Sequence, residues 1–421
     1  MTVDDAPGLI DQYRVLDLTD AKGQLAGKIL ADMGASVIKV EPPIGDSARN
    51  IPPFYQDDPA SEKSLYWWAY NTSKRGITLD LETADGRDVF LKLVAKSDVV
   101  LESFTPGYLA GIGLGYDDLV EAKEDIILVS LTPFGQTGPY AQYKATDFIN
   151  IAMSGNMYLT GDADRPPVAC QMATTHYHSC AETANATLSA LWFREVNGEG
   201  QHVDVSIHNA MQTVPLSGPS GFVLSGTKSR RSGARYTVNT PSGLTLQREV
   251  WPCKDGFVSF GLRGGPARIP PFQRLLQWMN EEGARCDFLK GIDWPNYDNN
   301  KLTQEEVDKM VEELTAFFMT KTSMELYEAA IEKGYMIAAV YNAASQLADK
   351  QLQDRDFFVP LEHPELKTSL TYPGSFVKSK DAFIGVRSRA PLIGEHNIEI
   401  FEGELGLRRD QLLTLKEAGI I

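Results

Sequence analysis

Apolar and polar positions follow a regular pattern in the first part of the chain. A short β-rich run over residues 13–18 (YRVLDL) precedes a turn at 21–23 and a helical stretch that reaches Met33. A second apolar run follows at 36–41 (SVIKVE). A strand, a helix and a second strand within about thirty residues form a β-α-β unit, whose two strands run parallel. The pattern therefore predicts a parallel, doubly wound sheet.

The same alternation continues along the chain. Four more strands are expected at residues 77–81, 98–103, 126–132 and 202–207, with helices around 86–96 and 181–195. Repeated β-α alternation is typical of a Rossmann-like α/β domain. The Gly-x-Gly-x-x-Gly fingerprint is missing from the sequence, so dinucleotide binding is not supported.

The middle of the chain has a different composition. Residues 217–243 are rich in Gly, Ser, Arg and Pro, which predicts a linker and loop region with little periodic structure. A smaller α+β module with an amphipathic helix over 304–318 comes next. The predicted division is a large Rossmann-like domain over 1–215, linkers and a small domain over 216–335, and a return to the large domain over 336–421.

Charge and cysteine content restrict the function. The net charge of −16 on 421 residues argues against nucleic acid or an anionic membrane surface as the main partner, because both need a basic footprint. Four widely spaced cysteines without a Cys-x-x-Cys pair are typical of a reduced, intracellular protein. No signal peptide and no apolar run of roughly 18 residues is found, so we expect a cytoplasmic protein.

Several loop motifs follow the predicted strands in a fixed order. They are GASVIKVEPPIGDSAR (34–49), NTSKRGITLDL (71–81), SDVVLESFTPGYLAGIGLGYDDL (97–119), LTPFGQTGPYA (131–141), EKGYMIAAV (332–340), LADKQLQDRDFF (347–358) and APLIGEHN (390–397). Taken alone, Arg49 or the Lys74–Arg75 pair would be read as ordinary surface residues. Taken together, the motifs resemble the family III (formate/carnitine-type) CoA-transferases from about residue 10 to the end of the chain.

The resemblance implies a fold, a substrate and a set of contacts. Two chains would thread through each other as interlocked rings, with the active site near the dimer interface. A CoA thioester would be the substrate, with no permanently bound cofactor and no metal. Contacts to CoA would fall on Asp20, Ala21, Lys22, Arg49, Asn71, Lys74, Arg75, Phe104 and Lys144.

The residue expected to act as nucleophile is missing. In the family, a turn after a Pro-Pro pair carries a nucleophilic aspartate, followed by a glycine and a helix of small residues. Counting forward from Pro166 and Pro167, and back from LSALW (188–192), puts His176 at the aspartate and Cys180 at the glycine. The family reaction stores CoA as a thioester on a carboxylate, and an imidazole cannot form a comparable thioester.

The sequence also departs from the family's motifs near the expected active site, at Ser103, Gly111 and Thr146. We therefore predict a non-nucleophilic subunit of a heteromeric CoA-transferase, with a paralogous partner subunit that carries the aspartate. By resemblance, succinyl-CoA would be the donor and benzylsuccinate, an acid of anaerobic toluene degradation, the acceptor. Two alternatives stay open. One is an active homodimeric transferase or isomerase that uses Glu182 or His176, and the other is a CoA-binding or regulatory pseudoenzyme.

Two further chemistries have weak support in the sequence. His176, His178 and Cys180 form an H-x-H-x-C spacing, but zinc needs three or four ligands with a defined second shell, and His202 and His208 fall on other elements. Racemases of the same fold use a His/Asp pair for α-proton exchange. Thr146 and His176 replace both members of that pair, so this activity is not supported.

Overall fold

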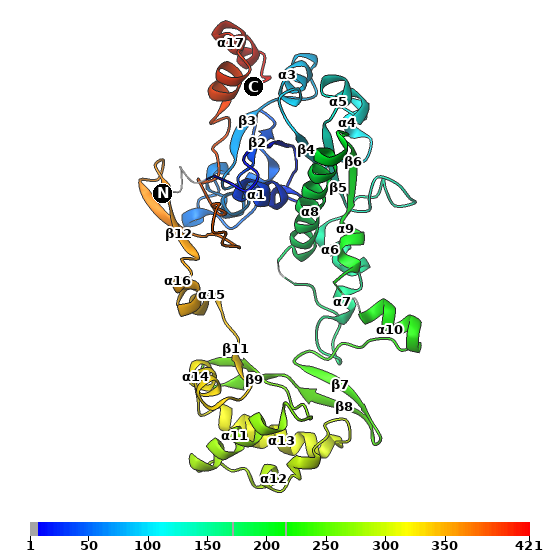
Figure 1. The fold of residues 1–421 in the computed structure, drawn as a ribbon, viewed down its shortest axis with the longest axis vertical. Helices are drawn as coiled ribbons and strands as arrows, with labels where there is room; N and C mark the ends of the chain where they lie inside the picture. The colour runs from blue at the N-terminus through cyan, green and yellow to red at the C-terminus, as the bar shows by residue number, and fades with distance from the viewer. Residues whose placement is uncertain (1–6, 171, 215–216) are drawn as a thin grey trace. The chain divides into compact units, whose positions relative to one another are not determined.

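A six-stranded parallel sheet is the main feature of the computed structural model, which describes residues 7–170, 172–214 and 217–421 (Figure 1). The strands are β1 (Arg14–Asp17), β2 (Ser36–Glu41), β3 (Arg75–Thr78), β4 (Val99–Glu102), β5 (Ile127–Thr132) and β6 (His202–Ser206). Their order in the sheet is β3-β2-β1-β4-β5-β6. The predicted doubly wound sheet is confirmed, with β3 beginning two residues before the expected run. The order reverses between β1 and β4, and ligands bind at such reversals in α/β sheets.

Both faces of this sheet are buried. Val15 and Val99 point to one face, where α1 (Gln24–Asp32) and α8 (Thr174–Asn197) cover them. Leu16 and Val100 point to the other face and pack against the apolar side of α3 (Ala84–Val94). Successive side chains of a strand alternate between faces, so strands covered on both sides read as continuous apolar runs. This burial explains why the strands were recognisable in the sequence.

The chain divides into two units. The large unit comprises Met1–Gly155, Cys170–Leu216 and Lys350–Ile421, and the small unit comprises Asn156–Ala169 and Ser217–Asp349. The large unit is thus built from both chain ends, as the sequence predicted. The sequence-based boundaries at residues 215 and 335 did not foresee the excursion over 156–169 or the extension to Asp349.

The C-terminal part of the large unit closes onto the sheet. It contains the hairpin of β12 (Phe358–His363) and β13 (Thr368–Pro373), a π-helical segment (Ile398–Glu404) and α17 (Arg409–Glu417). Ile400 and Phe401 are buried in the same cluster as Leu16. The Asn397 amide binds Thr78 twice, accepting from the backbone N–H at 2.9 Å and donating to Oγ1 at 2.8 Å. The segment from Lys350 to Ile421 is therefore an integral part of the large unit.

The small unit combines antiparallel strands with helices. Its elements include the hairpin β7 (Arg235–Thr240) and β8 (Gly243–Arg248), the sheet of β9 (Val250–Cys253), β10 (Gly256–Ser259) and β11 (Ala338–Ala339), and the helices α11 (Ile269–Glu281), α12 (Asp287–Lys290), α13 (Gln304–Phe318) and α14 (Ser323–Lys333). The core is aromatic, with Trp251 packed against Phe260 and Phe318. Thr303 and Thr322 start α13 and α14 with capping boxes. Within the described ranges, no helix has the length and apolar character needed to cross a bilayer.

Two local expectations are wrong. Residues 217–243 were expected to lack regular structure, yet they contain α10 (Ser217–Ser225) and β7. Strand β7 forms because it pairs with β8 from Arg235↔Arg248 to Thr240↔Gly243, and most of that partner lies beyond the loop-like composition. The helix expected at 181–195 begins at Thr174, so His176 lies in the first helical turn and not in a polar loop.

Candidate active site

A pocket of about 520 Å³ lies at the carboxyl edge of the sheet, where β1, β2, β3 and β4 end. It is lined by Leu18, Asp20, Val40, Glu41, Pro42, Ile44, Gly45, Asp46, Ser47, Asn50, Leu79, Asp80, Leu81, Glu82, Phe104 and Tyr108. This is the place where the strand order reverses, which is the usual ligand site of such sheets. Of the predicted contact residues, Asp20 and Phe104 are brought together here.

The pocket is acidic. Its described lining residues include five carboxylates and no Lys or Arg: Asp20, Glu41, Asp46, Asp80 and Glu82. Cations outside the lining pair with three of them: Lys22 with Asp20, Arg49 with Glu41, and Lys39 with Asp46 at 3.3 Å. A phosphate group entering this pocket would meet carboxylates without a cation facing it, which is unfavourable.

Arg49 was expected to contact phosphate, but its guanidinium group is directed into the protein. It is 1% exposed and binds Glu41 with two nitrogens, each at 2.7 Å. Its third nitrogen donates to Glu62 at 2.6 Å, and the group stacks on the Trp67 ring at 3.8 Å. It also donates to the Pro391 carbonyl at 3.0 Å. In this geometry Arg49 joins the end of β2 to the C-terminal segment.

Lys74 and Asn71 are likewise internal. The Lys74 Nζ donates to Asp17 Oδ2 at 2.8 Å, to the Gln24 carbonyl at 2.7 Å and to Asn71 Oδ1 at 2.9 Å. All three ammonium protons are thus used within the chain. Burial alone would raise the pKa of the Asp17 carboxyl, but Lys74 and Lys39 outweigh it and hold that pKa below its usual range. This cluster connects the end of β1 to the start of α1 and so stabilises the turn between them.

The other predicted cations do not enter the pocket either. Arg75 binds Glu399 at 2.6 Å, Glu404, and Ser36 Oγ at 2.9 Å, and so fastens β3 to the π-helical segment. Lys144 is exposed in the loop before α6 (Asp147–Met153) and does not line the pocket. Its contact with CoA stays a prediction.

The position of His176 is fixed by the start of α8. Asp147 Oδ1 accepts from the Thr175 backbone N–H at 2.9 Å and from its hydroxyl at 2.6 Å, and so caps the helix. Both ring nitrogens of His176 are buried, and neither has a hydrogen-bond partner among the described residues. Burial lowers the pKa of His176, and the nearby Asp147 charge offsets this only in part. The imidazole is therefore neutral at pH 7.

Two further candidate side chains, Cys180 and Glu182, follow His176 on α8. Cys180, one turn further along α8, donates from Sγ to the Lys22 carbonyl at 3.1 Å, and burial raises its pKa to about 12. The thiol therefore stays protonated and unreactive at neutral pH. Glu182 is exposed and, at six residues' separation, lies about 240° around the helix from His176. Its role as an alternative nucleophile stays a prediction.

The side chains of the H-x-H-x-C spacing do not converge in the structure. His178 is exposed and lies about 200° around α8 from His176, so these two side chains point to different faces. Across the part of the chain that the structure describes, no group of three or more His, Cys, Asp or Glu side chains is suited to hold a metal ion.

Two tyrosines of α2 (Leu65–Tyr70) contact the first βα turn and the start of α8, and the sequence analysis missed both. Tyr66 donates its hydroxyl to the Ala21 carbonyl at 3.0 Å, in the first βα turn. Tyr70 donates to the Tyr177 hydroxyl at 2.8 Å, next to His176 on α8. The i, i+4 spacing of the two tyrosines was the available signal, because it places both on one face of a helix.

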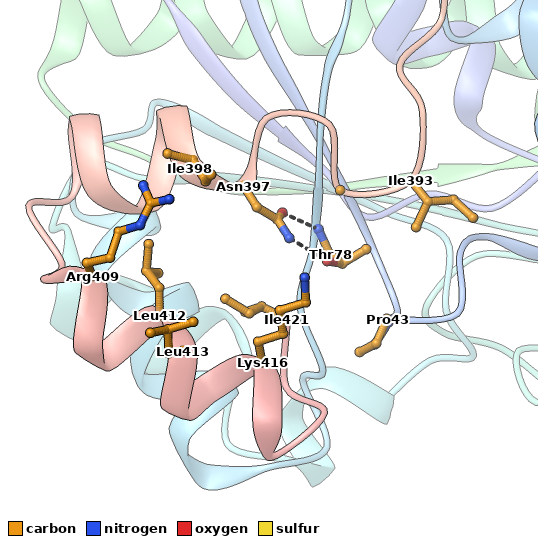
Figure 2. A pocket seen from close by; sticks show the side chains of 11 residues that line it. Pro43, Thr78, Ile393, Asn397, Ile398, Arg409, Leu412, Leu413, Lys416 and Ile421 are labelled. Atoms are coloured by element: carbon orange, nitrogen blue, oxygen red, sulfur yellow. Dashed lines mark hydrogen bonds between the residues drawn. The ribbon is translucent and has the colours of Figure 1, made fainter. Parts of the chain in front are cut away.

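A second hollow of about 420 Å³ lies beside β3 (Figure 2). It is lined by Pro43, Thr78, Ile393, Gly394, Asn397, Ile398, Arg409, Leu412, Leu413, Lys416 and Ile421. Figure 2 shows the Asn397–Thr78 hydrogen bonds on one side and the α17 residues on the other. Arg409 pairs with Glu402 at 3.2 Å. None of the sequence-predicted site residues lines this hollow.

Glu102 should make the free energy of unfolding depend on pH. Burial raises the pKa of Glu102 to about 7, although the Phe104 N–H donates to it at 2.6 Å. The folded state then holds a proton that the unfolded state releases near pH 4.5. Stability attributable to Glu102 should therefore fall as pH rises from 4.5 to 7, by on the order of 3 kcal/mol.

Urea unfolding at pH 5 and pH 8 tests this prediction. Glu102→Gln should remove this part of the pH dependence, so that the variant gains stability over the natural chain at pH 8 relative to pH 5. The exposed Glu121→Gln serves as a control of equal charge change and should leave the profile unchanged. Identical pH profiles for Glu102→Gln and the natural chain would contradict the assignment.

The fold and the pocket together define a Rossmann-like α/β protein with its ligand site at the reversal of strand order. The model of CoA-transferase family III matches residues 10–397, and the chain therefore belongs to that family. CoA-transferases use CoA thioesters as substrates, and the curated relatives support a CoA-transferase here.

Two relatives and one solved structure illustrate the similarity. The chain is 32% identical to the succinyl-CoA:(R)-benzylsuccinate CoA-transferase subunit BbsE of Thauera aromatica, with 92% of each chain covered. It is 30% identical to the succinyl-CoA–D-citramalate CoA-transferase of Chloroflexus aurantiacus, covering 99% of this chain and 98% of that one. A CAIB/BAIF family protein from Brucella suis superposes with a TM-score of 0.79 at 28% identity, covering 95% and 100% of the two chains.

Proposed function

We propose that this chain is the non-nucleophilic subunit of a heteromeric CoA-transferase whose paralogous partner supplies the catalytic aspartate. The observation that carries the proposal is His176, a buried and neutral imidazole at the position where the family resemblance places the nucleophile. The interlocked dimer implied by that resemblance would make the pairing obligatory.

The reaction explains why the side chain at position 176 matters. The partner's carboxylate attacks the thioester carbonyl of the donor, the C–S bond breaks, and a mixed anhydride and the CoA thiolate result. The thiolate then attacks the carbonyl of the partner's aspartate, releasing the donor acid and leaving CoA as an enzyme thioester. The acceptor carboxylate repeats these steps in reverse order and leaves as the new CoA thioester. His176 can enter none of these steps as a carboxylate does.

The sheet-edge pocket also supports a partner subunit that carries the catalytic site. Its five carboxylates and the internal pairing of Arg49, Lys74 and Arg75 are unfavourable for a phosphate-bearing ligand. The similarity to BbsE, which is named as a subunit, supports a heteromer. By that similarity we infer succinyl-CoA as the donor and (R)-benzylsuccinate as the acceptor, a place in anaerobic toluene degradation and a cytoplasmic location.

Reconstitution tests this proposal. Three preparations are compared: this chain purified alone, its aspartate-bearing paralogue purified alone, and the two purified together after co-expression. Transfer of CoA from succinyl-CoA to benzylsuccinate is followed by chromatography of the CoA esters. We expect transfer to require both chains. Full activity of this chain by itself would overturn the proposal and favour Glu182 or His176 as nucleophile. CoA binding without transfer in any combination would favour a regulatory pseudoenzyme.

A further inference from the structure

One face of α17 is cationic at both ends and apolar in the middle. Arg409, Leu412, Leu413 and Lys416 all line the hollow of about 420 Å³ beside β3, and Figure 2 shows the two leucines between the two cations. The four residues follow the i, i+3, i+4, i+7 spacing that places side chains on one side of a helix. From the rise of a helix, Arg409 and Lys416 lie about 10 Å apart along its axis.

The remaining side chains of the hollow are neutral and mainly apolar. They include Pro43, Ile393 and Ile398. Ile398 is 56% exposed, and Leu413 on α17 is 58% exposed. No Asp or Glu is among the described lining residues, in contrast to the five carboxylates of the sheet-edge pocket. A hydrocarbon chain that covered these exposed apolar side chains would be bound favourably, because it removes apolar surface from water.

Hydrogen bonds fix the walls of the hollow. The Asn397 amide holds the C-terminal segment against Thr78 at the end of β3. Two residues further along the chain from Thr78, the Asp80 backbone N–H donates to the Ile420 carbonyl at 2.8 Å. The segment is thus tied to β3 and its following loop at two places. A hollow with fixed walls is largely preformed, which lowers the entropic cost of binding a ligand.

Both cations of this face can accept an anion from outside the chain. Lys416 takes part in no ion pair with another described residue, and Arg409 pairs with Glu402 at 3.2 Å. The Arg409 and Glu402 side chains are 67% and 40% exposed. A pair so exposed to solvent contributes little to stability, so the carboxylate of a ligand can share or replace it. Arg49 and Lys74 differ in this respect, because buried carboxylates bind them.

We propose that this hollow binds an elongate organic diacid as an effector. One carboxylate lies on Arg409, the other lies on Lys416, and the hydrocarbon chain between them packs against Leu412 and Leu413. The lining residues are unsuited to other classes of ligand. A divalent cation would meet two positive charges and no Asp or Glu side chain, and a nucleobase would find no aromatic ring among the described lining residues. A short diacid cannot reach both cations when they are about 10 Å apart.

The diacid is bound here as an effector and takes no part in the transfer reaction. Neither His176 nor any Asp, Glu or Cys is among the described lining residues. The hollow adjoins the sheet-edge pocket, because Pro43 and Thr78 line the hollow while their chain neighbours Pro42 and Leu79 line the pocket. A bound diacid would therefore contact the two loops that shape the sheet edge. The inference does not depend on the proposed function, since binding is measured on the chain alone.

Calorimetric titration of the full chain with octanedioate tests the proposal, because this diacid is long enough to reach both cations. The double variant Arg409→Ala/Lys416→Ala should weaken binding about tenfold or more, through the loss of two charge-assisted contacts. The control Arg285→Ala/Lys301→Ala removes the same charge at residues that are 73% and 75% exposed and lie outside the hollow. It should change binding less than about twofold.

Ligand length and charge provide a second test. Affinity should fall in the order octanedioate, octanoate, succinate, since octanoate reaches one cation and succinate cannot span the two. Leu413→Ala, at an exposed position where folding is not at risk, should weaken octanedioate binding severalfold through lost apolar contact.

Four outcomes would overturn the assignment. Equal weakening by both double variants would show a general charge effect and no site. Octanoate that bound as tightly as octanedioate would show that only one cation is used, and succinate that bound as tightly would show a site for a short diacid. Octanedioate that gave neither heat of binding nor a rise in unfolding temperature would show that the hollow does not bind a diacid.

Discussion

Replacing the partner's catalytic aspartate by alanine should abolish CoA transfer by the complex, while His176→Ala should leave it within about twofold. Removing the nucleophile of a covalent mechanism lowers the rate on the order of 10³-fold or more. The His176 imidazole is neutral, buried and without a hydrogen-bond partner among the described residues, so its loss removes no step of the reaction. The measurement is kcat and KM of the purified complex for both substrates.

A change in folding must be separated from a change in chemistry. His176→Ala leaves a small void at the start of α8, so thermal unfolding of each complex is recorded beside the kinetics. His176→Asn, which keeps a polar side chain of similar volume, provides a second variant. A tenfold or greater fall in kcat for both variants, with unchanged unfolding temperature, would show that His176 takes part in catalysis.

Arg49→Ala should be among the most destabilising single substitutions in the large unit. The change removes both bonds to the buried Glu41 carboxylate, the stacking on Trp67 and the bond to Pro391. Breaking a buried ion pair by removing one partner costs about 3–5 kcal/mol, because the other charge is left buried and uncompensated. Urea unfolding of the purified chain measures the loss directly.

Urea unfolding and the KM for succinyl-CoA together distinguish a structural role of Arg49 from a role in ligand binding. Arg409→Ala removes an exposed arginine whose pair with Glu402 is also exposed, and should cost at most about 1 kcal/mol. If Arg49→Ala left the free energy of unfolding unchanged within 1 kcal/mol and raised the KM for succinyl-CoA, the phosphate contact expected from the motif would be right.

The strands were predictable because a parallel sheet buries both faces. The runs, such as IILVSLT at 126–132, are mainly apolar and are followed by a recognisable turn. Strand β7 was missed because its sequence, RYTVNT, is polar on the face that carries Arg235, and only pairing with β8 makes it a strand. The start of α8 was missed for a related reason, since its cap is Asp147, which lies 28 residues earlier in the chain.

The sequence by itself determined the class of fold and the family. Those properties depend on the local period of apolar residues and on the order of motifs, and both can be counted along the chain. Only the tertiary structure decided what the charged residues do. Arg49 and Pro391 are 342 positions apart, and the carboxylates and carbonyls that take up a cation's donors come within range only when distant segments fold together. At the sheet edge this folding pairs Arg49 with Glu41 and Lys74 with Asp17, contacts that no counting along the chain could foresee.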